Sequence, residues 1–258
     1  MNGTIKVLTL NIGNPSIERA KKQVNWLKTR TEDIFVLTET KNSEGCNYIA
    51  DSFSGYTTDL FSVNSAMHVS FPLSLTGDHG VMCISKFPIK RETFPYSKSS
   101  QYYCRHIETD IDINNRVLHI VGLYVPSRDQ SSEKIERKKV FLEKTYELIK
   151  DLHNPSSIIC GDFNILDRNH FPHYSFFKNW EYEFYDNLLK MGYVDAFRKC
   201  HPTINEYSWV GRTNDGYRYD YCFVSKKLST RVLQCDFIHE TRLNHLTDHS
   251  ALCIELQC

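Results

Sequence analysis

Residues 157–164 read SIICGDFN, and this stretch decides the fold. The run from Ser157 to Cys160 is apolar and predicts a buried strand. Asp162 and Asn164 follow at its C-terminal end, where the chain leaves the core. A tight turn alone would also favour Asp and Asn, so the functional interpretation needs support from elsewhere in the chain.

Three further stretches end in polar side chains of the same kind. They are LTLN up to Asn11, VLTE up to Glu39, and LTDH with Asp248 and His249. The first two close apolar runs, Ile5–Leu10 and Ile34–Leu37, that also predict strands. Mg²⁺ prefers oxygen ligands, typically one or two carboxylates with water and substrate phosphate. The four stretches together therefore indicate a divalent metal held against a phosphate, as in a nuclease.

Size and composition point to one domain, residues 1–258, because no linker, low-complexity tract or repeat divides the chain. Thirty-one basic and 31 acidic residues cancel, so only a local basic patch could attract nucleic acid. Nine scattered cysteines without a C-x-x-C pair indicate buried thiols rather than a disulfide or zinc framework. Without a signal-peptide pattern or an apolar run of about 18 residues, we expect a cytoplasmic (intracellular) protein with no membrane contact.

Strands and helices are expected to alternate along the chain. The further strands are predicted over Gly80–Ile84, Cys104–Ile113, Arg116–Tyr124, Tyr219–Val224 and Ala251–Leu256. Helices are predicted over 16–31 with Ser16 as N-cap, over 133–152 and near 180–191. Asn114-Asn115 is the expected hairpin turn. This alternation predicts an α/β protein with mixed sheets covered by helices.

Eight elements occur in an order that resembles one known family. They are Leu10-Asn11; Glu39-Thr40-Lys41; Gly80-Val81 with SKFPI at 85–89; Tyr124-Val125-Pro126; GDFN at 161–164; GYVDAFR at 192–198 with His201-Pro202; YSW at 207–209 with GYRYDY at 216–221; and TDH at 247–249. Over nearly the whole chain they resemble the endonuclease/exonuclease/phosphatase superfamily, and within it the exonuclease III-like apurinic/apyrimidinic endonucleases. The resemblance implies a four-layer α/β sandwich, two packed mixed β-sheets flanked by helices, whose strand ends meet at one site.

The resemblance also implies roles in the hydrolysis of a phosphate ester by in-line attack of water. Glu39 would bind Mg²⁺, for which Mn²⁺ would substitute, and Asp248 and Asn11 would lie near the metal or bind it through water. Asp162 would orient or deprotonate the attacking water. Asn164 would hold water or a phosphate oxygen.

Three further residues follow from the same resemblance. His249 would bond a non-bridging phosphate oxygen or transfer a proton, and Asp220 would fix its tautomer. Tyr124 corresponds to the family's phosphate-contacting tyrosine, where deoxyribonuclease I-like, sphingomyelinase and deadenylase relatives show a His. Ser127 departs from the family's Asn or Gln and weakens one expected phosphate contact.

Several features keep two interpretations. The apolar stretch 60–76 suits a lid or substrate-selecting loop, or an inserted packing segment. Trp180, Trp209 and Tyr217 suit a sugar or base, or the core. The basic residues of 134–139 (Lys134, Arg137, Lys138 and Lys139) suit a nucleic-acid strip, or the solvated face of a helix.

The leading hypothesis is a Mg²⁺-dependent phosphodiesterase acting on DNA as a monomer, either an apurinic/apyrimidinic endonuclease or a 3′ exonuclease. The alternative is a phosphatase or phosphodiesterase of the same superfamily acting on RNA, a nucleotide, a phospholipid or an inositol phosphate. The neutral charge and the 60–76 segment favour that alternative, whereas Tyr124 and the match over residues 192–221 oppose it. A non-catalytic interaction module is a third hypothesis, opposed because every catalytic position is retained.

Overall fold

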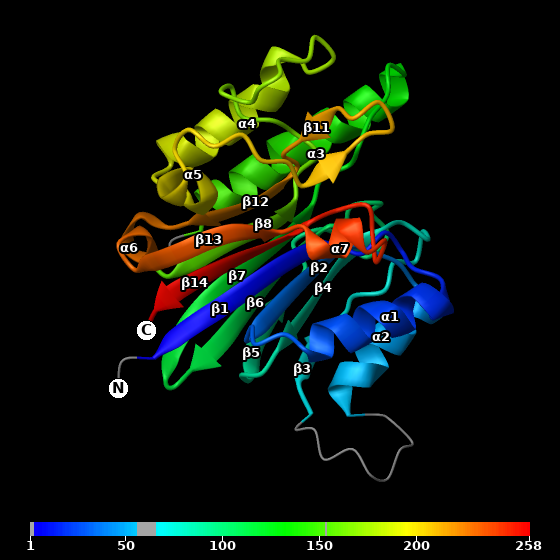
Figure 1. Cartoon of the computed structure of the whole chain (residues 1–258), viewed down its shortest axis with the longest axis vertical. Helices are drawn as coiled ribbons and strands as arrows, with labels where there is room; N and C mark the ends of the chain where they lie inside the picture. Colours follow the sequence, from blue (N-terminus) through cyan, green and yellow to red (C-terminus); the bar gives the residue numbers. More distant parts are fainter. Residues whose placement is uncertain (1–2, 56–65, 153) are drawn as a thin grey trace.

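Two six-stranded sheets packed face to face form the centre of the molecule, in a computed structural model that describes residues 3–55, 66–152 and 154–258. The first sheet has the order β13-β14-β1-β2-β4-β3, and the second has the order β5-β6-β7-β8-β12-β9. Figure 1 shows α1 and α2 on the outer side of the first sheet and α3 and α4 beyond the second. The expected four-layer sandwich is confirmed.

The strands and helices have the following bounds. The first sheet comprises β1 (Thr4–Asn11), β2 (Ile34–Thr40), β3 (His68–Ser70), β4 (Gly80–Ser85), β13 (Val232–Ile238) and β14 (Ala251–Gln257). The second comprises β5 (Ile89–Thr93), β6 (His106–Ile113), β7 (Arg116–Tyr124), β8 (Ser157–Asp162), β9 (Val194–Asp195) and β12 (Asp220–Val224). A separate hairpin pairs β10 (Trp209–Val210) with β11 (Gly216–Tyr217). The helices are α1 (Ile17–Lys28), α2 (Glu44–Ser54), α3 (Ser132–Lys150), α4 (Asn179–Lys190), α5 (Ala196–Cys200), α6 (Lys226–Ser229) and α7 (Glu240–Leu243).

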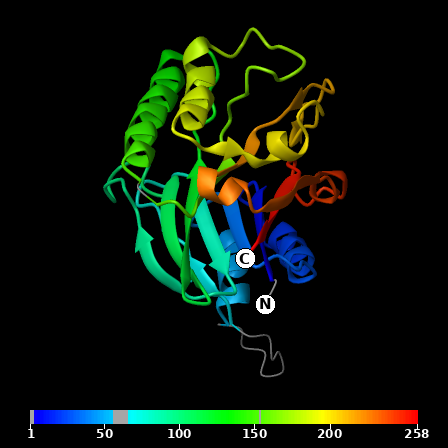
Figure 2. The same cartoon turned by 90° about the vertical axis from the view of Figure 1, so that its left-hand side faces the viewer.

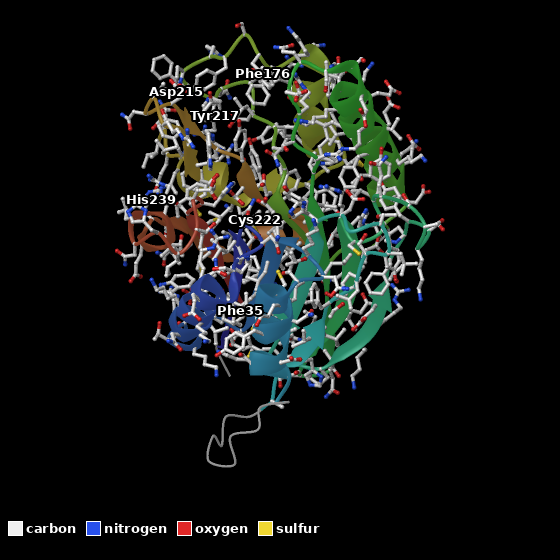
Figure 3. All side chains as sticks on the ribbon, turned by 90° about the vertical axis from the view of Figure 1, so that its right-hand side faces the viewer. Phe35, Phe176, Asp215, Tyr217, Cys222 and His239 are labelled. Carbon is white, nitrogen blue, oxygen red and sulfur yellow. The ribbon has the colours of Figure 1, made fainter. Side chains whose placement is uncertain are left out.

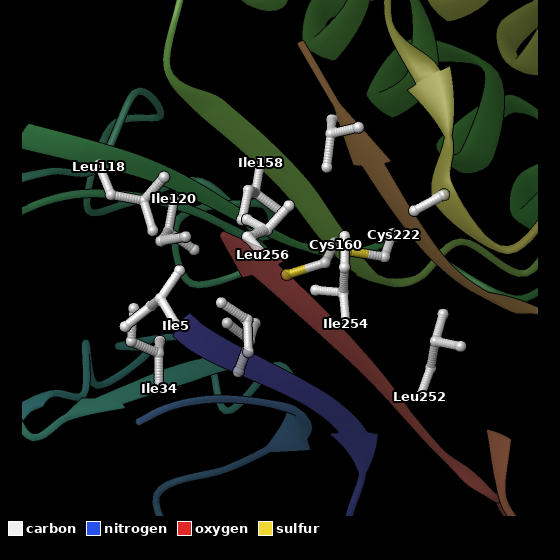
Figure 4. Close-up of a cluster of buried hydrophobic side chains, with 14 of the residues drawn as sticks. Ile5, Ile34, Leu118, Ile120, Ile158, Cys160, Cys222, Leu252, Ile254 and Leu256 are labelled. Atoms are coloured by element: carbon white, nitrogen blue, oxygen red, sulfur yellow. The ribbon is translucent and has the colours of Figure 1, made fainter. Parts of the chain in front are cut away.

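Aliphatic side chains and cysteine thiols from both sheets fill the layer between them. In Figure 4, Ile5 and Ile254 of the first sheet face Ile158 and Cys160 of the second. A second cluster joins the second sheet to α3 and α4, which lie side by side in Figure 2, and a third joins the first sheet to α1 and α2. The central strands, such as β2, β4, β8 and β12, therefore bury residues on both faces, which explains why their sequences read as continuous apolar runs.

Local sequence signals explain where several elements begin and turn. Ser16 caps α1 by accepting a hydrogen bond from the Arg19 amide at 3.4 Å, as expected. Asn114 and Asn115 have positive φ angles of 53° and 66°, which suit the tight hairpin between β6 and β7. The close packing of the two sheets requires a residue without a side chain at Gly122, because a Cβ there would lie 2.8 Å from Val81 Cγ1.

The structure corrects one sequence interpretation and bears on another. Lys138 does not lie on a solvated face of α3, because its side chain is buried beneath α4 and pairs with Glu181. In the stretch 60–76, residues 60–65 lie outside the described residues. Residues 68–70 form edge strand β3, and Val69 and Phe71 pack against the α1–α2 layer, which agrees with a packing segment.

All nine cysteines are free thiols, and six of them are buried, as expected for small apolar side chains. Within the described residues, none of the helices is both long and apolar enough to cross a lipid bilayer.

Candidate active site

Three strands of the second sheet place polar side chains at the same level. In register, Asp162 at the end of β8 lies beside Asp220 of β12 on one side and Tyr124 of β7 on the other. All three are buried, with at most 6 % of each residue exposed. The sheet register alone therefore collects residues that are far apart in the sequence.

Backbone geometry around Asp162 explains the residues that flank it. Gly161 has a φ angle of 139°, and a Cβ there would lie 2.0 Å from the Leu123 carbonyl oxygen, so only glycine fits. Asn164 is left-handed at φ 48°, a conformation that Asn tolerates better than most residues. Its amide NH₂ donates to Asp162 Oδ2 at 3.2 Å and to the Val125 carbonyl at 3.1 Å. Asn164 thus holds the carboxylate that precedes it.

Asn11 links the first sheet to Asp162. Its amide Nδ2 donates to Asp162 Oδ2 at 2.8 Å, and its Oδ1 accepts from the Gly13 amide at 2.9 Å. Thr247 supports Asn11 from the other direction, because its hydroxyl donates to the Asn11 carbonyl at 2.8 Å. The two sheets are therefore connected by a hydrogen bond inside the site itself.

A β-bulge places Glu39. In the pairing of β2 with β4, Thr38 faces Val81 and Thr40 faces Gly80, so Glu39 is the extra residue between them. Its φ angle of 59° is uncommon for a residue with a side chain, and such strain is concentrated at functional positions. The bulge is what turns the Glu39 carboxylate away from the sheet, a feature that the sequence did not reveal.

His249 and Asp220 form a buried pair. His249 Nδ1 and Asp220 Oδ2 lie 2.7 Å apart, and the pair is enclosed by the β10–β11 hairpin through a bridge between His249 and Trp209. The Ser208 hydroxyl accepts hydrogen bonds from the amides of Asp220 and Tyr219. The neighbouring Arg218 pairs with Asp167 and Asp195 instead of Asp220. The Asp220 carboxylate therefore bonds His249 and not Arg218.

The site holds several charges that shift one another's pKa. Burial, together with the charge of Asp220, raises the pKa of Asp162 to about 7, although His249 and Asn11 oppose the shift. Burial lowers the pKa of His249, but Asp220, Asp162 and Asp248 outweigh it and raise the value to about 9. Burial and the charges of Glu39 and Asp162 raise the pKa of Tyr124, so its hydroxyl stays protonated and can donate a hydrogen bond. At neutral pH the site thus combines a poised carboxylate with a cationic imidazole.

An aromatic surface flanks the exposed side of the site. The Trp209 indole donates to Asp248 Oδ2 at 2.9 Å, and Tyr217 stacks on Tyr174 with ring centroids 4.3 Å apart. Trp209, Tyr217 and Tyr174 are only partly buried, so these rings are not core residues. Figure 3 shows Tyr217 in the upper part of the molecule, well separated from Phe35 in the layer next to α1. Trp180 is different, because it packs against the α3–α4 layer.

The oxygen donors predicted for a metal fit a divalent cation. Burial and the charge of Asp248 raise the pKa of Glu39, while the Asn11 amide and His249 oppose the rise. A cation bound beside Glu39 and Asp248 would offset the repulsion between these two carboxylates. In residues 3–55, 66–152 and 154–258 no three His, Cys, Asp or Glu side chains surround one metal position. The predicted set contains only two carboxylates, the third donor being the Asn11 amide.

The structure brings all eight predicted site residues into one connected cluster. They are Asn11, Glu39, Tyr124, Asp162, Asn164, Asp220, Asp248 and His249. Beside it lies a cavity of about 410 Å³ that the sequence did not indicate. Glu39 and Tyr124 form the wall shared with the cluster, and Arg105 and Arg137 are among the basic residues that line the rest. Arg105 directly precedes β6 and no motif marks it, whereas Arg137 of α3 belongs to the basic residues of 134–139 that the sequence singled out.

Comparison with known proteins agrees with the fold and with the motif order. The model of the endonuclease/exonuclease/phosphatase family matches residues 8–249. The chain is 25% identical to exodeoxyribonuclease III of Haemophilus influenzae over 228 residues, which cover 75% of this chain and 82% of that one. It is 26% identical to an exodeoxyribonuclease of Bacillus subtilis over 248 residues, 88% of this chain and 91% of the relative.

Solved structures superpose over almost the whole chain. An AP endonuclease from Archaeoglobus fulgidus matches with a TM-score of 0.80 and 24% identity, over 97% of this chain and 98% of that one. A 3′ phosphatase from Neisseria, bound to a product DNA hairpin, matches with a TM-score of 0.81 and 21% identity, over 98% and 99%. At these identities the superpositions establish the fold. Together with the match over residues 8–249, they show that the chain belongs to the endonuclease/exonuclease/phosphatase family.

Proposed function

We propose that this protein is a Mg²⁺-dependent phosphodiesterase that hydrolyses DNA, as an apurinic/apyrimidinic endonuclease or a 3′ exonuclease. The observation that carries the proposal is the cluster in which Asp162 lies beside the Asp220–His249 pair, at the meeting point of two sheets. Relatives named exodeoxyribonuclease support DNA as the substrate, because they match most of the chain.

Asp162 is the group that orients the attacking water and accepts its proton. Because its pKa is about 7, Asp162 is ionised in a large share of the protein molecules at neutral pH, and it can also hold the proton that it takes from water. Asn11 and Asn164 fix its direction through hydrogen bonds of 2.8 and 3.2 Å. A base held from two sides loses little entropy when the water is bound.

His249 and Tyr124 stabilise charge on the phosphate. The imidazole is cationic below pH 9 and uses Nδ1 for Asp220, which leaves Nε2 to donate to a phosphate oxygen. The Tyr124 hydroxyl would donate a hydrogen bond to the same phosphate.

Glu39, Asp248 and Asn11 would hold the metal ion, on which members of this family in general depend. When bound, a divalent cation neutralises charge on the phosphate and polarises it for attack. All three donors are hard oxygen ligands, which suits Mg²⁺ with Mn²⁺ as a substitute.

A panel of substrates tests the proposal. Duplex DNA with an abasic site, a duplex with a recessed 3′ end, single-stranded DNA, RNA and inositol phosphates are each incubated with Mg²⁺, with and without excess chelator. We expect cleavage of one of the duplexes that chelation abolishes. Preferential hydrolysis of RNA or inositol phosphates would establish the alternative substrate class, and activity in excess chelator would reject the metal requirement.

Glu39→Gln provides the matched test of the metal site. It retains the shape of the side chain but removes its charge, so it should raise the Mg²⁺ concentration needed for half-maximal rate without lowering Tm. An unchanged Mg²⁺ requirement would show that other groups bind the metal.

A further inference from the structure

Three hydrogen-bonded side chains lead from the protein surface to the segment that carries the active-site imidazole. Ser250 Oγ and His239 Nδ1 lie 2.8 Å apart, and His239 Nε2 and Glu206 Oε1 lie 2.7 Å apart. Ser250 is fully buried and directly follows His249, whereas the side chains of His239 and Glu206 are 32% and 29% exposed. Figure 3 shows His239 at the edge of the molecule. A partly exposed residue is therefore connected to the active site.

The chemistry of these groups fixes the direction of both hydrogen bonds. A carboxylate only accepts, so His239 Nε2 carries the proton that is donated to Glu206. In the neutral imidazole the other nitrogen is an acceptor, and the Ser250 hydroxyl donates to it. The Ser250 oxygen also accepts from Arg242, whose Nε lies at 3.3 Å. Each link therefore joins a donor to an acceptor.

The same side chains close a ring around the carboxylate–imidazole pair of the active site. Two residues after Glu206, the Ser208 hydroxyl accepts from the Asp220 amide at 3.1 Å, and the Ser208 carbonyl accepts from the Ser250 amide at 2.7 Å. His239 thus ties the segment that holds Asp220 to the segment that carries the imidazole. Because the pair depends on a contact of 2.7 Å, a small shift between these segments would misalign it.

We propose that His239 is a positioning residue, which keeps His249 aligned with Asp220 by accepting the Ser250 hydroxyl. The inference rests on the proposed function, because it takes His249 as the group that acts on the phosphate. The two bonds of His239 have different tasks. The bond to Ser250 holds the segment, and the bond to Glu206 keeps Nδ1 free of a proton so that it can accept.

Two substitutions of His239 separate these bonds. Asn places an amide oxygen near the position of Nδ1 and can still accept from Ser250, whereas Gln places an amide nitrogen near the position of Nε2 and can still donate to Glu206. Both remove the ring, which stacks on Phe237 with centroids 6.2 Å apart, so both should lower Tm to a similar extent. We expect His239→Gln to lower kcat by about tenfold with little change in KM, and His239→Asn to retain most of kcat.

Ser250→Ala removes the same link from its other end. Its kcat should fall as in His239→Gln, and the double variant should lose little more, because both changes delete one hydrogen bond. The control is His201→Gln. His201 forms a comparable surface pair with Asp236 at 2.6 Å, and its imidazole bonds this carboxylate of β13 instead of the 247–250 segment. This control should leave kcat unchanged.

Proton NMR of the His249 ring provides a readout that does not need cleavage. The Nδ1 proton shared with Asp220 exchanges with water when the pair opens. A hydrogen bond of about 1 kcal/mol changes such an opening equilibrium by about fivefold. Exchange should therefore be about fivefold faster in His239→Gln and Ser250→Ala, and near the wild-type rate in His239→Asn.

The two readouts separate the positioning role from the proposed function. If wild type cuts no DNA and the exchange pattern is still found, the proposed function fails and the positioning role stands. If His239→Asn and His239→Gln lose kcat equally, or if exchange is the same in all variants, the positioning role is rejected. Should a His239 variant fail to fold, normal kcat and normal exchange in Ser250→Ala would overturn the proposal.

Discussion

Asp220 gives one carboxylate oxygen to His249 at 2.7 Å, while its other oxygen, Oδ1, has no hydrogen-bond partner within the described residues. The carboxylate is fully buried, so its negative charge depends on the imidazolium beside it. Such a pair acts as one unit, because the imidazole is neither charged nor correctly oriented without the carboxylate.

Kinetics of Asp220→Asn, His249→Gln and the double variant should therefore be strongly non-additive. Losing His249 should lower kcat by about 10²-fold or more, Asp220→Asn should lose much of that factor, and the double variant little more. The loss should fall in kcat, since a misoriented imidazole fails chiefly in the transition state. Single losses that multiply in the double variant would show that the two residues act separately.

His79 gives a prediction about stability and pH. Its pKa is about 4 in the folded protein and about 6.5 in an unfolded chain, so only the unfolded chain gains the proton between these values. The folded state therefore loses stability as pH falls from 6.5 to 4, and His79→Gln should remove that part of the loss. Thermal melts at pH 7.5 and 4.5 measure it: the variant's Tm relative to wild type should rise at the lower pH. His68→Gln, at an exposed position of β3, is the control, and equal shifts in both variants would contradict the assignment.

At the scale of elements, α3 and α4 support the loop after β8. Lys138 of α3 donates to the Asn164 carbonyl at 2.6 Å and to Glu181 of α4 at 2.6 Å. Arg128 also donates hydrogen bonds to both carboxylate oxygens of Glu181. The backbone of the left-handed residue Asn164 is thus fixed by a buried ammonium from α3.

Lys138→Met keeps the length of this side chain but removes its charge. Breaking a buried pair costs on the order of 3 kcal/mol, and the loosened loop should lower kcat by about tenfold. The Glu181 carboxylate keeps Arg128 as its partner in this variant, so the protein should still fold. Lys139→Met, on the more exposed side of α3, should change neither value. Unchanged kcat in a destabilised Lys138→Met protein would show that Lys138 contributes to folding alone.

The sequence predicted that the eight polar residues would lie together, because most of them follow strands; their catalytic roles stay a prediction. An apolar run with a polar end is a local pattern, and the ends of packed strands meet by geometry. The Arg105 cavity was indicated only in part. Lys134 and Arg137 belong to the basic residues of 134–139 that the sequence singled out, whereas Arg105 comes from a separate element and carries no motif. Lys138 was misjudged for a related reason: a lysine on a helix normally faces water, and its partner Glu181 lies 43 positions away.

Helix α2 was missed although its signals are present. Ser43 accepts from the Cys46 amide as an N-cap, Gly55 ends the helix in the left-handed conformation, and Ile49 and Phe53 continue the buried side. The position of Glu39, in contrast, has no signal in the sequence. A one-residue bulge in β2 leaves no mark in the sequence, because its cause is the pairing with β4.

At the scale of the whole molecule, the distance between the sheets controls the site. A Cβ at Gly122 would lie 2.8 Å from Val81 Cγ1 and 3.1 Å from Val36 Cγ1, across the inter-sheet layer. Gly122→Ala should cost about 1–3 kcal/mol through overpacking and should lower kcat by separating Asn11 from Asp162. Denaturant unfolding and kcat are measured beside Val117→Ala, an exposed change on the same strand. Full kcat in a destabilised Gly122→Ala protein would show that the site tolerates movement of the sheets.

The hydrogen bond between Asn11 and Asp162 has a consequence for when the protein becomes active. Glu39 and Asn11 are made early in synthesis, Asp162 later, and His249 and β14 after almost everything else. A chain cut before residue 245 would keep Glu39 and Asp162 but lack His249 and strand β14, which pairs with β1. The complete cluster can therefore form only after nearly the whole chain has been synthesised and its first and last segments have met.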